Sequence, residues 1–572
     1  MSTSSGRPQW LISLLLWAAP LAFLAVFYFF PLGAILDLSF ARGQAGWLEP
    51  LRQVLASSSI RRVIAFTFGQ AGLSTLLTLA VGLPGAYVFG RFTFPGKDLL
   101  RALTGIPFVL PTLVVAAAFN ALLGPSGWVN LALMRSFGLS EAPVGFLHTF
   151  GAILLAHVFY NTTIVLRMVG DFWAHLDPRM SDAARMLGAN RWQTLRQVVL
   201  PQLSPAVLTA SLLVFIFNFT SFGVVLLLGG PQFATMEVEI YYQTVSLFNL
   251  PLAAALSMLQ LLFTLGLTLA YTRLVARWTR PLSLQARRIT QRPPTSTSTR
   301  WLVALVIGLL LVLLIVPMLG LATRSLVALG PTRPGEPALR GLTLAFYRQL
   351  SANPQGSLFF VPPTTAILVS LQYAVATVGL ALLLGLPASW ALAYRAGSFL
   401  SRLLDPLLML PLGTSAVTLG LGFIVALDSP PVDLRASPVL IPLAHTLVAF
   451  PFVVRSLVPA LRSIQPRLRQ AAASLGASPA AVIQHVDLPL VGRALIVAAA
   501  FAFTISLGEF GATALIARPE YPTVPIVIYR LLSRPGALNY GQALALSTIL
   551  MLVTGAGMLA IERFRLADVG EF

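Results

Sequence analysis

The chain has 572 residues, of which 57% are hydrophobic and only 10% are charged. A soluble protein of this size carries about a quarter charged residues, so lipid must cover much of this surface. The absence of cysteine excludes disulfides, thiolate catalysis and Cys-ligated metals. The net charge of +19 lies in short basic clusters between apolar runs, a pattern typical of membrane-flanking loops and not of a nucleic-acid partner.

Apolar windows free of Asp, Glu, Lys and Arg recur along the whole chain. A membrane-spanning helix needs about 20 such residues, and the first window is too long for a signal-peptide core. The windows predict an all-α, polytopic membrane protein of about 12 transmembrane helices. They are 10–36, 64–90, 102–123, 149–166, 206–230 and 249–272, then 301–323, 365–394, 406–427, 436–454, 494–508 and 540–561. The window 494–508 is short, so we expect its helix to continue past Glu509.

The basic residues predict the orientation of these helices. Most of them fall in segments that face the cytoplasm if both termini are cytoplasmic, as the positive-inside rule requires. Residues 281–300, with Pro293 and Pro294, read as a cytoplasmic linker. The Pro- and Gly-rich segment 324–364 then lies outside.

An internal repeat divides the chain into two homologous six-helix halves, 1–280 and 301–572. A shift of 288 residues superimposes many residues without gaps, among them His157 on His445, Phe222-Gly223 on Phe510-Gly511, and Ile240-Tyr241 on Ile528-Tyr529. Upstream the register changes, which places an insertion near 125–145 of the first half. Each half has an even number of helices, so both halves have the same orientation in the membrane. We therefore expect a pseudo-two-fold axis along the membrane normal and a pathway between the halves.

Each half carries the same hydrophilic motif between its fourth and fifth helices. An Ala-Ala pair is followed by a glycine and then by Leu-Pro, where the chain re-enters the membrane. We expect an acid at the positive end of a short helix that the glycine ends. The residues are Asp182, Ala183, Ala184, Gly188, Leu200 and Pro201 in the first half, and Gln470, Ala471, Ala472, Gly476, Leu488 and Pro489 in the second.

These two loops resemble the EAA loop of binding-protein-dependent ABC importers of the type I fold. The spacing matches throughout, although Asp182 and Gln470 stand where the motif has Glu. The resemblance implies a permease subunit of the bacterial inner membrane whose two loops each dock one copy of a separate ATPase. It also implies an extracytoplasmic substrate-binding protein.

The chain is not expected to be an enzyme or to bind a cofactor itself. A Walker A loop ends in Gly-Lys-Ser/Thr, whereas Lys97 is followed by Asp98. ATP and Mg²⁺ are therefore expected to be used by the partner ATPase.

Two segments bear on the substrate. The stretch 221–241 resembles fused thiamine permeases. The stretch 507–513 resembles them too, but also iron(III) and oxyanion permeases. Thiamine or its phosphates are therefore the favoured substrates, and ferric iron is the alternative.

Few ionisable residues fall within or beside the windows. Glu509 is a candidate for the pathway; alternatively it pairs with a neighbouring helix end or lies at the interface. His157 and His445 have no nearby acids in sequence, so hydrogen bonding is favoured over a metal site. Arg167 and Arg455 are expected to end the fourth helices at the cytoplasmic surface.

Two other classes of membrane protein compete with the permease. A secondary transporter also has parallel halves, but it usually carries charges within its helices. A membrane enzyme would need clustered acids, histidines or a nucleophile, and the sequence shows no such constellation.

Overall fold

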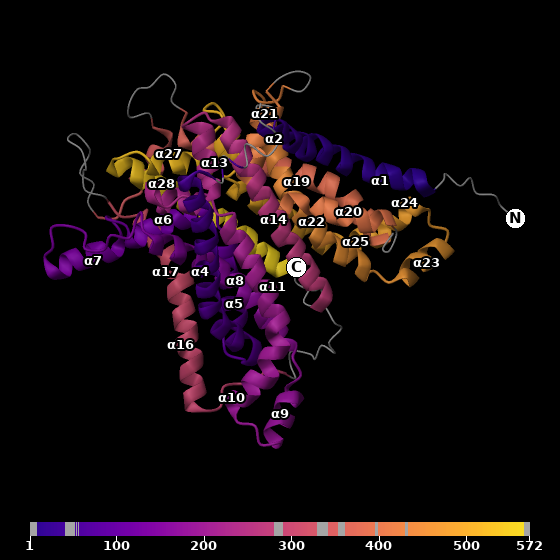
Figure 1. Cartoon of the computed structure of the whole chain (residues 1–572). Helices are drawn as coiled ribbons and strands as arrows, with labels where there is room; N and C mark the ends of the chain where they lie inside the picture. Colours follow the sequence, from indigo (N-terminus) through magenta and orange to yellow (C-terminus); the bar gives the residue numbers. More distant parts are fainter. Residues whose placement is uncertain are drawn as a thin grey trace.

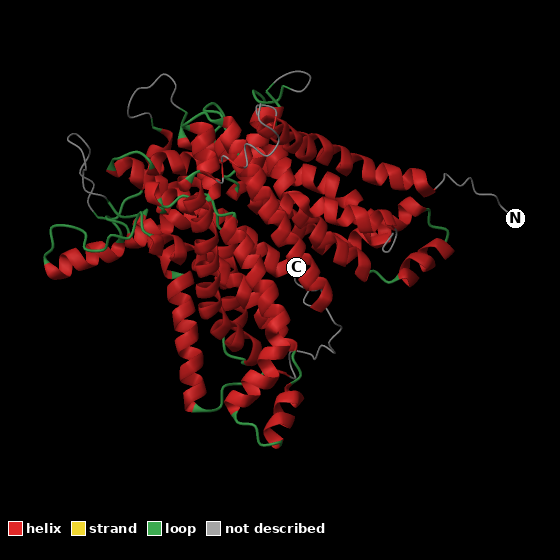
Figure 2. Ribbon diagram, viewed as in Figure 1, coloured by secondary structure: helices red, strands yellow, loops and turns green. Residues whose placement is uncertain are grey.

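The computed structural model describes residues 9–40, 52, 54, 56–278, 290–328, 341–352, 361–394, 399–428 and 433–564. Within these ranges the chain is helical, with two isolated β-bridges and no strand (Figure 2). Eleven helices are long and apolar enough to cross a membrane, or twelve if one bent pair counts as a span. The all-α, 12-helix prediction is thus confirmed. Residues 281–289 of the expected linker, and parts of 324–364, lie outside the described residues.

The helices of the first half follow the predicted windows, with additional short helices between them. Their bounds are α1 Gln9–Leu24, the π-helix Ala25–Phe29, α2 Phe30–Phe40, α4 Ser58–Arg91, α5 Lys97–Val109, α6 Thr112–Leu123, α7 Trp128–Phe137, α8 Phe150–His175, α9 Pro178–Met186, α10 Arg191–Thr194, η2 Leu195–Val199, α11 Leu200–Phe219, α12 Gly223–Leu228, α13 Met236–Val245 and α14 Leu250–Trp278.

The second half repeats this order. Its helices are α16 Thr297–Leu314, α17 Val316–Arg324, α18 Ala345–Arg348, α19 Pro363–Tyr394, α20 Phe399–Met409, η5 Leu410–Gly413, α21 Ala416–Ala426, α22 Leu440–Ser463, α23 Pro466–Ser474, α24 Pro479–Val482, η6 Ile483–Asp487, α25 Leu488–Gly508, α26 Thr513–Ile516, α27 Val524–Leu532 and α28 Ala537–Phe564.

The third predicted span of each half is broken, contrary to the expectation of a continuous helix. In the first half α5 ends at Val109, and Leu110 and Pro111 leave the helical conformation before α6 begins. In the second half the segments Leu403–Gly413 and Ala416–Ala426 meet at 95°. Ser415 Oγ accepts the Thr418 N–H at 3.1 Å and so starts α21 afresh. Proline has no N–H, which favours the corresponding break at Pro111.

The expected continuation of a helix past Glu509 is also wrong. Helix α25 ends at Gly508, and Glu509 has extended backbone angles (φ −67°, ψ 123°). The Glu509 carboxylate accepts hydrogen bonds from the Ala512 N–H at 2.8 Å and the Thr513 N–H at 3.0 Å. These bonds satisfy the first donors of α26, so the chain turns here instead of continuing α25.

The first helices of each half pack on helices of the other half. From the first half, α1 packs on α19 and α2 packs on α21 of the second half. Tyr28 Oη lies 2.6 Å from Thr414 Oγ1. Conversely, α16 packs on α4 and α17 packs on α6. The Trp128 indole N–H, beside α6, donates to the Gly320 carbonyl of α17 at 3.2 Å. The two sequence halves therefore interlock and do not sit side by side as separate bundles.

The helices form two arms that diverge from a common region. Figure 1 shows one arm running down to α9 and the other running right to α23, with α13 and α21 near the region where the arms meet. The largest buried cluster lies where they meet, because it joins Phe222 and Val225 of the first half to Leu507 and Phe510 of the second. The two predicted docking loops thus lie at the far ends of the arms.

Candidate functional site

The first docking loop is a short capped helix, α9. Asp177 begins it, since its Oδ1 accepts the Arg179 N–H at 2.9 Å, and Pro178 occupies the first turn. Asp182 lies in the middle of the helix, exposed, with its Oδ2 3.9 Å from Nη2 of Arg292. The expectation that Asp182 opens the helix is therefore wrong. A better capping pair precedes it, which the Asp-Pro sequence at 177–178 could have shown.

The glycine of each loop stops its helix as predicted. Gly188 has φ +90° and Gly476 has φ +87°, conformations that side chains rarely adopt. The Gly188 N–H donates to the Arg185 carbonyl and the Ala189 N–H to the Ala184 carbonyl, both at 3.0 Å. Gly476 and Ala477 make the same pair of bonds to Ala473 and Ala472 at 3.0 Å. This is a Schellman motif in both loops.

Large apolar side chains stand exposed at the tip of each loop. Met186 and Leu187 are 89% and 90% exposed, and Leu475, the repeat partner of Leu187, is 89% exposed. Ala183 and Ala471 are exposed beside them. A cluster of exposed apolar groups on a hydrophilic loop is typical of a surface that a partner covers.

Leu200-Pro201 and Leu488-Pro489 lie where each loop joins its membrane helix. They are the first residues of α11 and α25, and each pair follows a π-helical turn, η2 or η6. A proline cannot donate to the preceding turn, and π-helical turns are one way to absorb this. The second short helix of each loop, α10 or α24, thus runs directly into α11 or α25, whereas α9 and α23 are separated from it by the turn that contains the glycine.

The second loop contains a buried ion pair that the first lacks. Arg469 Nε lies 2.7 Å from Asp487 Oδ1, and the Asp487 side chain is buried. The corresponding residues of the first half are Ser181 and Val199. Sequence reasoning missed this pair, although opposite charges at both positions of one half alone were a visible signal.

Four aromatic side chains meet where the two halves join; we call them the aromatic stack. The rings of Phe222 and Phe510 stack with centroids 5.3 Å apart and planes at 18°. Tyr241 packs on Phe222 at 5.3 Å, and Tyr529 packs on Phe510 at 5.6 Å. Both pairs are related by the repeat, so the pseudo-two-fold axis passes between the two phenylalanines. The repeat matched these residues, but only the structure brings them together.

Glu237 lies one helical turn before Tyr241 and is 1% exposed. Its carboxylate accepts hydrogen bonds from Gln260 Nε2 and from Ser415 Oγ, each at 2.5 Å, and Ser415 belongs to the other half. Its helix α13 lies outside the candidate spans, and burial raises the pKa of Glu237 to about 8, since a charged carboxylate is costly to desolvate. Its repeat partner is Pro525, so the second half has no acid at the equivalent position.

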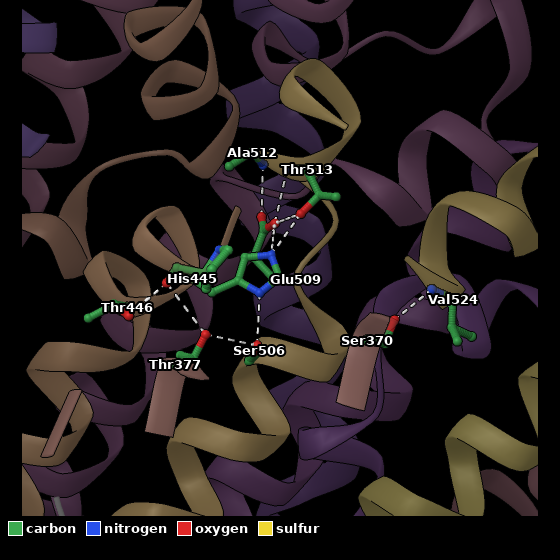
Figure 3. A network of polar contacts seen from close by, with 10 residues as sticks. Ser370, Thr377, His445, Thr446, Ser506, Glu509, Ala512, Thr513 and Val524 are labelled. Carbon is green, nitrogen blue, oxygen red and sulfur yellow. Dashed lines mark hydrogen bonds and ion pairs between the residues drawn. The ribbon is translucent and has the colours of Figure 1, made fainter. Parts of the chain in front are cut away.

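The two histidines related by the repeat each lie in a polar network, but only the network of His445 contains a carboxylate. His157 Nε2 lies 2.8 Å from Ser221 Oγ, and His445 Nε2 lies 3.3 Å from Glu509 Oε2. Ser221 is the repeat partner of Glu509. Figure 3 shows His445 between Ser506 and Glu509, with Glu509 facing Ala512 and Thr513.

These networks bear on the predictions for Glu509 and the histidines. The Glu509 hydrogen bonds shown all go to its own half, so it pairs with a helix end; its role in the pathway stays a prediction. Among the described residues no group of three His, Asp or Glu could hold a metal.

Beside the Glu509 network, α27 is tied to α19. The Val524 N–H donates to Ser370 Oγ at 2.8 Å (Figure 3). The same bond holds α13 in the first half, where the Met236 N–H donates to Thr67 Oγ1 at 3.0 Å. The helices that carry Tyr241 and Tyr529 are therefore fixed to their own halves in the same way.

Arg167 does not end its helix, contrary to expectation. Helix α8 continues to His175, and Arg167 is buried. Its Nη2 lies 3.0 Å from Glu562 Oε2 at the end of α28, so it joins the two halves. The apolar window ended before Arg167, but the helix continues because the charge has a partner, the partly buried Glu562, on α28.

Comparison with known proteins agrees with this architecture. Residues 82–280 match the family model of the binding-protein-dependent transport system inner membrane component. The chain is 28% identical over 508 residues to the thiamine transport system permease protein ThiP of Escherichia coli K12, covering 87% of this chain and 88% of that protein. It is 29% identical over 572 residues to the probable ABC transporter permease y4fN of Sinorhizobium fredii, covering 98% and 97%. The chain is thus similar to ABC transporter permeases over nearly its whole length.

The chain is also similar to proteins half its length. It is 29% identical over 266 residues to the putative 2-aminoethylphosphonate permease PhnU of Salmonella paratyphi A, covering 46% of this chain and 92% of that one. A bacterial ABC transporter for alginate import matches with a TM-score of 0.41 and 19% identity, over 48% of this chain and 97% of that chain. With its apolar helices, the chain is a multi-pass protein of the inner membrane.

Proposed function

We propose that this permease carries thiamine or its phosphates into the cell. The observation that carries the proposal is the extent of the similarity to a thiamine permease, which covers 87% of the chain and therefore both halves. The 2-aminoethylphosphonate permease matches over one half's length only, and so supports that substrate less. Ferric iron stays an alternative.

Transport requires a separate ATPase that docks on the two loops. The support is their duplicated structure: each has a short helix with a glycine stop and an exposed apolar tip, followed by a second short helix that continues into α11 or α25. Gly188 and Gly476 therefore mark two docking sites, one for each of two ATPase copies. The chain has no Gly-Lys-Ser/Thr sequence, so ATP and Mg²⁺ bind the partner.

The orientation follows from the same assignment. With α9 and α23 on the cytoplasmic side, both termini are cytoplasmic. The opposite face receives a substrate-binding protein, in keeping with the name of the matched family.

Reconstitution tests this function. The chain, purified with its ATPase and binding protein in proteoliposomes, should take up labelled thiamine only with ATP, and a mass measurement should give one copy of this chain with two of the ATPase. Uptake of 2-aminoethylphosphonate instead would replace the substrate. Uptake driven by an ion gradient without the ATPase, or two copies of this chain per complex, would contradict the assignment.

A further inference from the structure

We propose that the aromatic stack, together with Glu237, is the closed gate of the pathway and the place where it contacts its substrate, a flat organic cation. The proposal rests on the proposed function and names the chemistry by which this permease recognises its solute. It is carried by the position of the stack, by its close packing and by its charge.

The position of the stack is that of a gate. It lies on the pseudo-two-fold axis, where a pathway between equivalent halves must pass. Phe222 follows α11, whose 20 residues extend about 30 Å from Leu200, enough to cross the hydrocarbon core. The stack therefore lies near the outer end of the pathway. The rings of Phe222 and Phe510 stack there with centroids 5.3 Å apart, which closes the pathway at this level.

A glycine after each phenylalanine lets the neighbouring segments approach closely. A Cβ at Gly223 would collide with Thr112 Oγ1 and lie 3.2 Å from Phe510 of the other half. A Cβ at Gly511 would lie 2.8 Å from the Ala416 Cβ. Thr112 and Ala416 are the first residues of α6 and α21, which follow the broken spans. Movement of these helix starts would therefore separate the rings.

The chemistry of the stack favours a cationic ring. Separation of the halves would expose aromatic faces from both sides, and such faces attract cations and stack on flat rings. Glu237, one turn before Tyr241, adds a carboxyl group at the same junction, because its partner Ser415 directly precedes Ala416. Burial keeps this carboxyl mostly neutral, and an opening that returns it to water would lower its pKa and give it a negative charge. This acid is present in one half only, which suits a solute with a single positive charge.

Other charged groups near the stack must be weighed against this. Arg530 directly follows Tyr529 and lies close enough to Tyr241 to affect its ionisation. Glu239, on α13, is engaged by Gln243 Nε2 at 2.7 Å. Arg530 would favour an anion and Glu237 a cation, so the two residues give opposite predictions for the substrate.

The test uses the complete complex in proteoliposomes, with labelled thiamine as the probe. The KM for thiamine should rise about tenfold in Phe222→Leu, Phe510→Leu and Glu237→Gln, the size expected from lost ring–cation contacts. Phe233→Leu is the matched control, because Phe233 stacks on Phe150 within the first half, and its KM should be unchanged. Arg530→Gln should leave the KM unchanged or lower it.

A second measurement tests the gate without relying on turnover. Vesicles loaded with thiamine should leak it without ATP about tenfold faster in the double variant Phe222→Ala and Phe510→Ala than in wild type, because the plug of the pathway is lost. If the double variant leaks thiamine no faster than wild type, the stack is not the gate.

The outcomes separate this inference from the proposed function. Wild-type uptake of thiamine with an unchanged KM in all three variants overturns the contact site but keeps the function. A raised KM in Arg530→Gln and not in Glu237→Gln overturns the cationic substrate. If the wild type takes up 2-aminoethylphosphonate and not thiamine, the chain is still part of an importer, but the proposal of a cationic substrate is wrong. If neither is taken up with ATP, the proposed function itself fails.

Discussion

At the scale of single residues, the repeat has kept positions and changed charges. The two histidines occupy equivalent places, yet His157 faces a serine and His445 faces Glu509. The carboxylate of Glu509 accepts two backbone N–H bonds that start α26, and Thr513 donates its hydroxyl as well. A buried carboxylate needs hydrogen-bond donors in place of water, and Glu509 has them in these three bonds. We therefore read Glu509 as a residue that shapes the chain beside the stack.

Replacing Glu509 with alanine should destabilise the protein. The Ala512 and Thr513 N–H groups would lose a charged acceptor in a buried site, so the free energy of unfolding should fall by about 2 kcal/mol. Thermal unfolding in detergent measures this. Glu520→Ala removes an exposed carboxylate only 11 positions away and should leave the unfolding temperature unchanged. Equal stability of the two variants would show that Glu509 does not hold this turn.

At the scale of elements, the docking loops depend on how their helices end. Neither glycine has any atom within 4 Å of the site of a Cβ. A substitution there costs backbone strain and not a collision, because residues with a Cβ pay about 1–2 kcal/mol in the left-handed conformation. The two loops are otherwise held differently, with the Arg469–Asp487 ion pair in the second alone.

Gly188→Val and Gly476→Val should each reach the membrane in normal amounts but transport poorly. The strain would move the docking helix away from its Schellman geometry, and 1.4 kcal/mol corresponds to about a tenfold loss of correctly placed loops. Gly188→Asn should be milder, because asparagine tolerates this conformation better.

The control for these variants lies on a helix outside the docking loops. Gly138, at the end of α7, also has positive φ (+64°) and free space around it. Gly138→Val should therefore strain the backbone equally without impairing ATP-driven uptake, measured beside membrane abundance. Parental transport by both Val variants of the loops would remove the main support for docking there.

At the scale of the whole molecule, the exchange of first helices ties the halves together. The helices α1 and α2 complete the second half, and α16 and α17 complete the first. The Arg167–Glu562 ion pair adds a polar tie between α8 and α28. An opening between the arms must therefore carry α1 with the second half, not with the chain segment that follows it, whereas α2 packs on both α21 and α14.

A disulfide can test this exchange, since the chain has no cysteine of its own. A Cβ at Gly320 of α17 would lie 3.6 Å from the Leu122 Cβ of α6, within the range that disulfides require. The variant Leu122→Cys with Gly320→Cys should form a cross-link on mild oxidation, seen as a mobility shift after cleavage of the linker. Leu122→Cys with Gly308→Cys, on α16, should not cross-link. The absence of a bond in the first pair would contradict the exchange.

The sequence by itself determined the features that depend on local properties. Apolar windows located the helices because a membrane span must be apolar along its own length. The repeat revealed equivalent positions such as Gly188 and Gly476, and the glycines marked helix ends because φ > 0 is a property of one residue. The spacing of the docking motif was readable for the same reason.

Only the tertiary structure decided what depends on neighbours distant in sequence. The stacking of Phe222 on Phe510, the bond from Glu237 to Ser415 and the pairing of Glu509 with His445 require the folded interface. The apolar window predicted a helix that continues past Glu509, but the helix ends there because the carboxylate accepts two backbone N–H groups three and four residues ahead. The exchange of first helices was equally invisible, since an apolar helix in lipid shows no preference for either half until side chains pack against it.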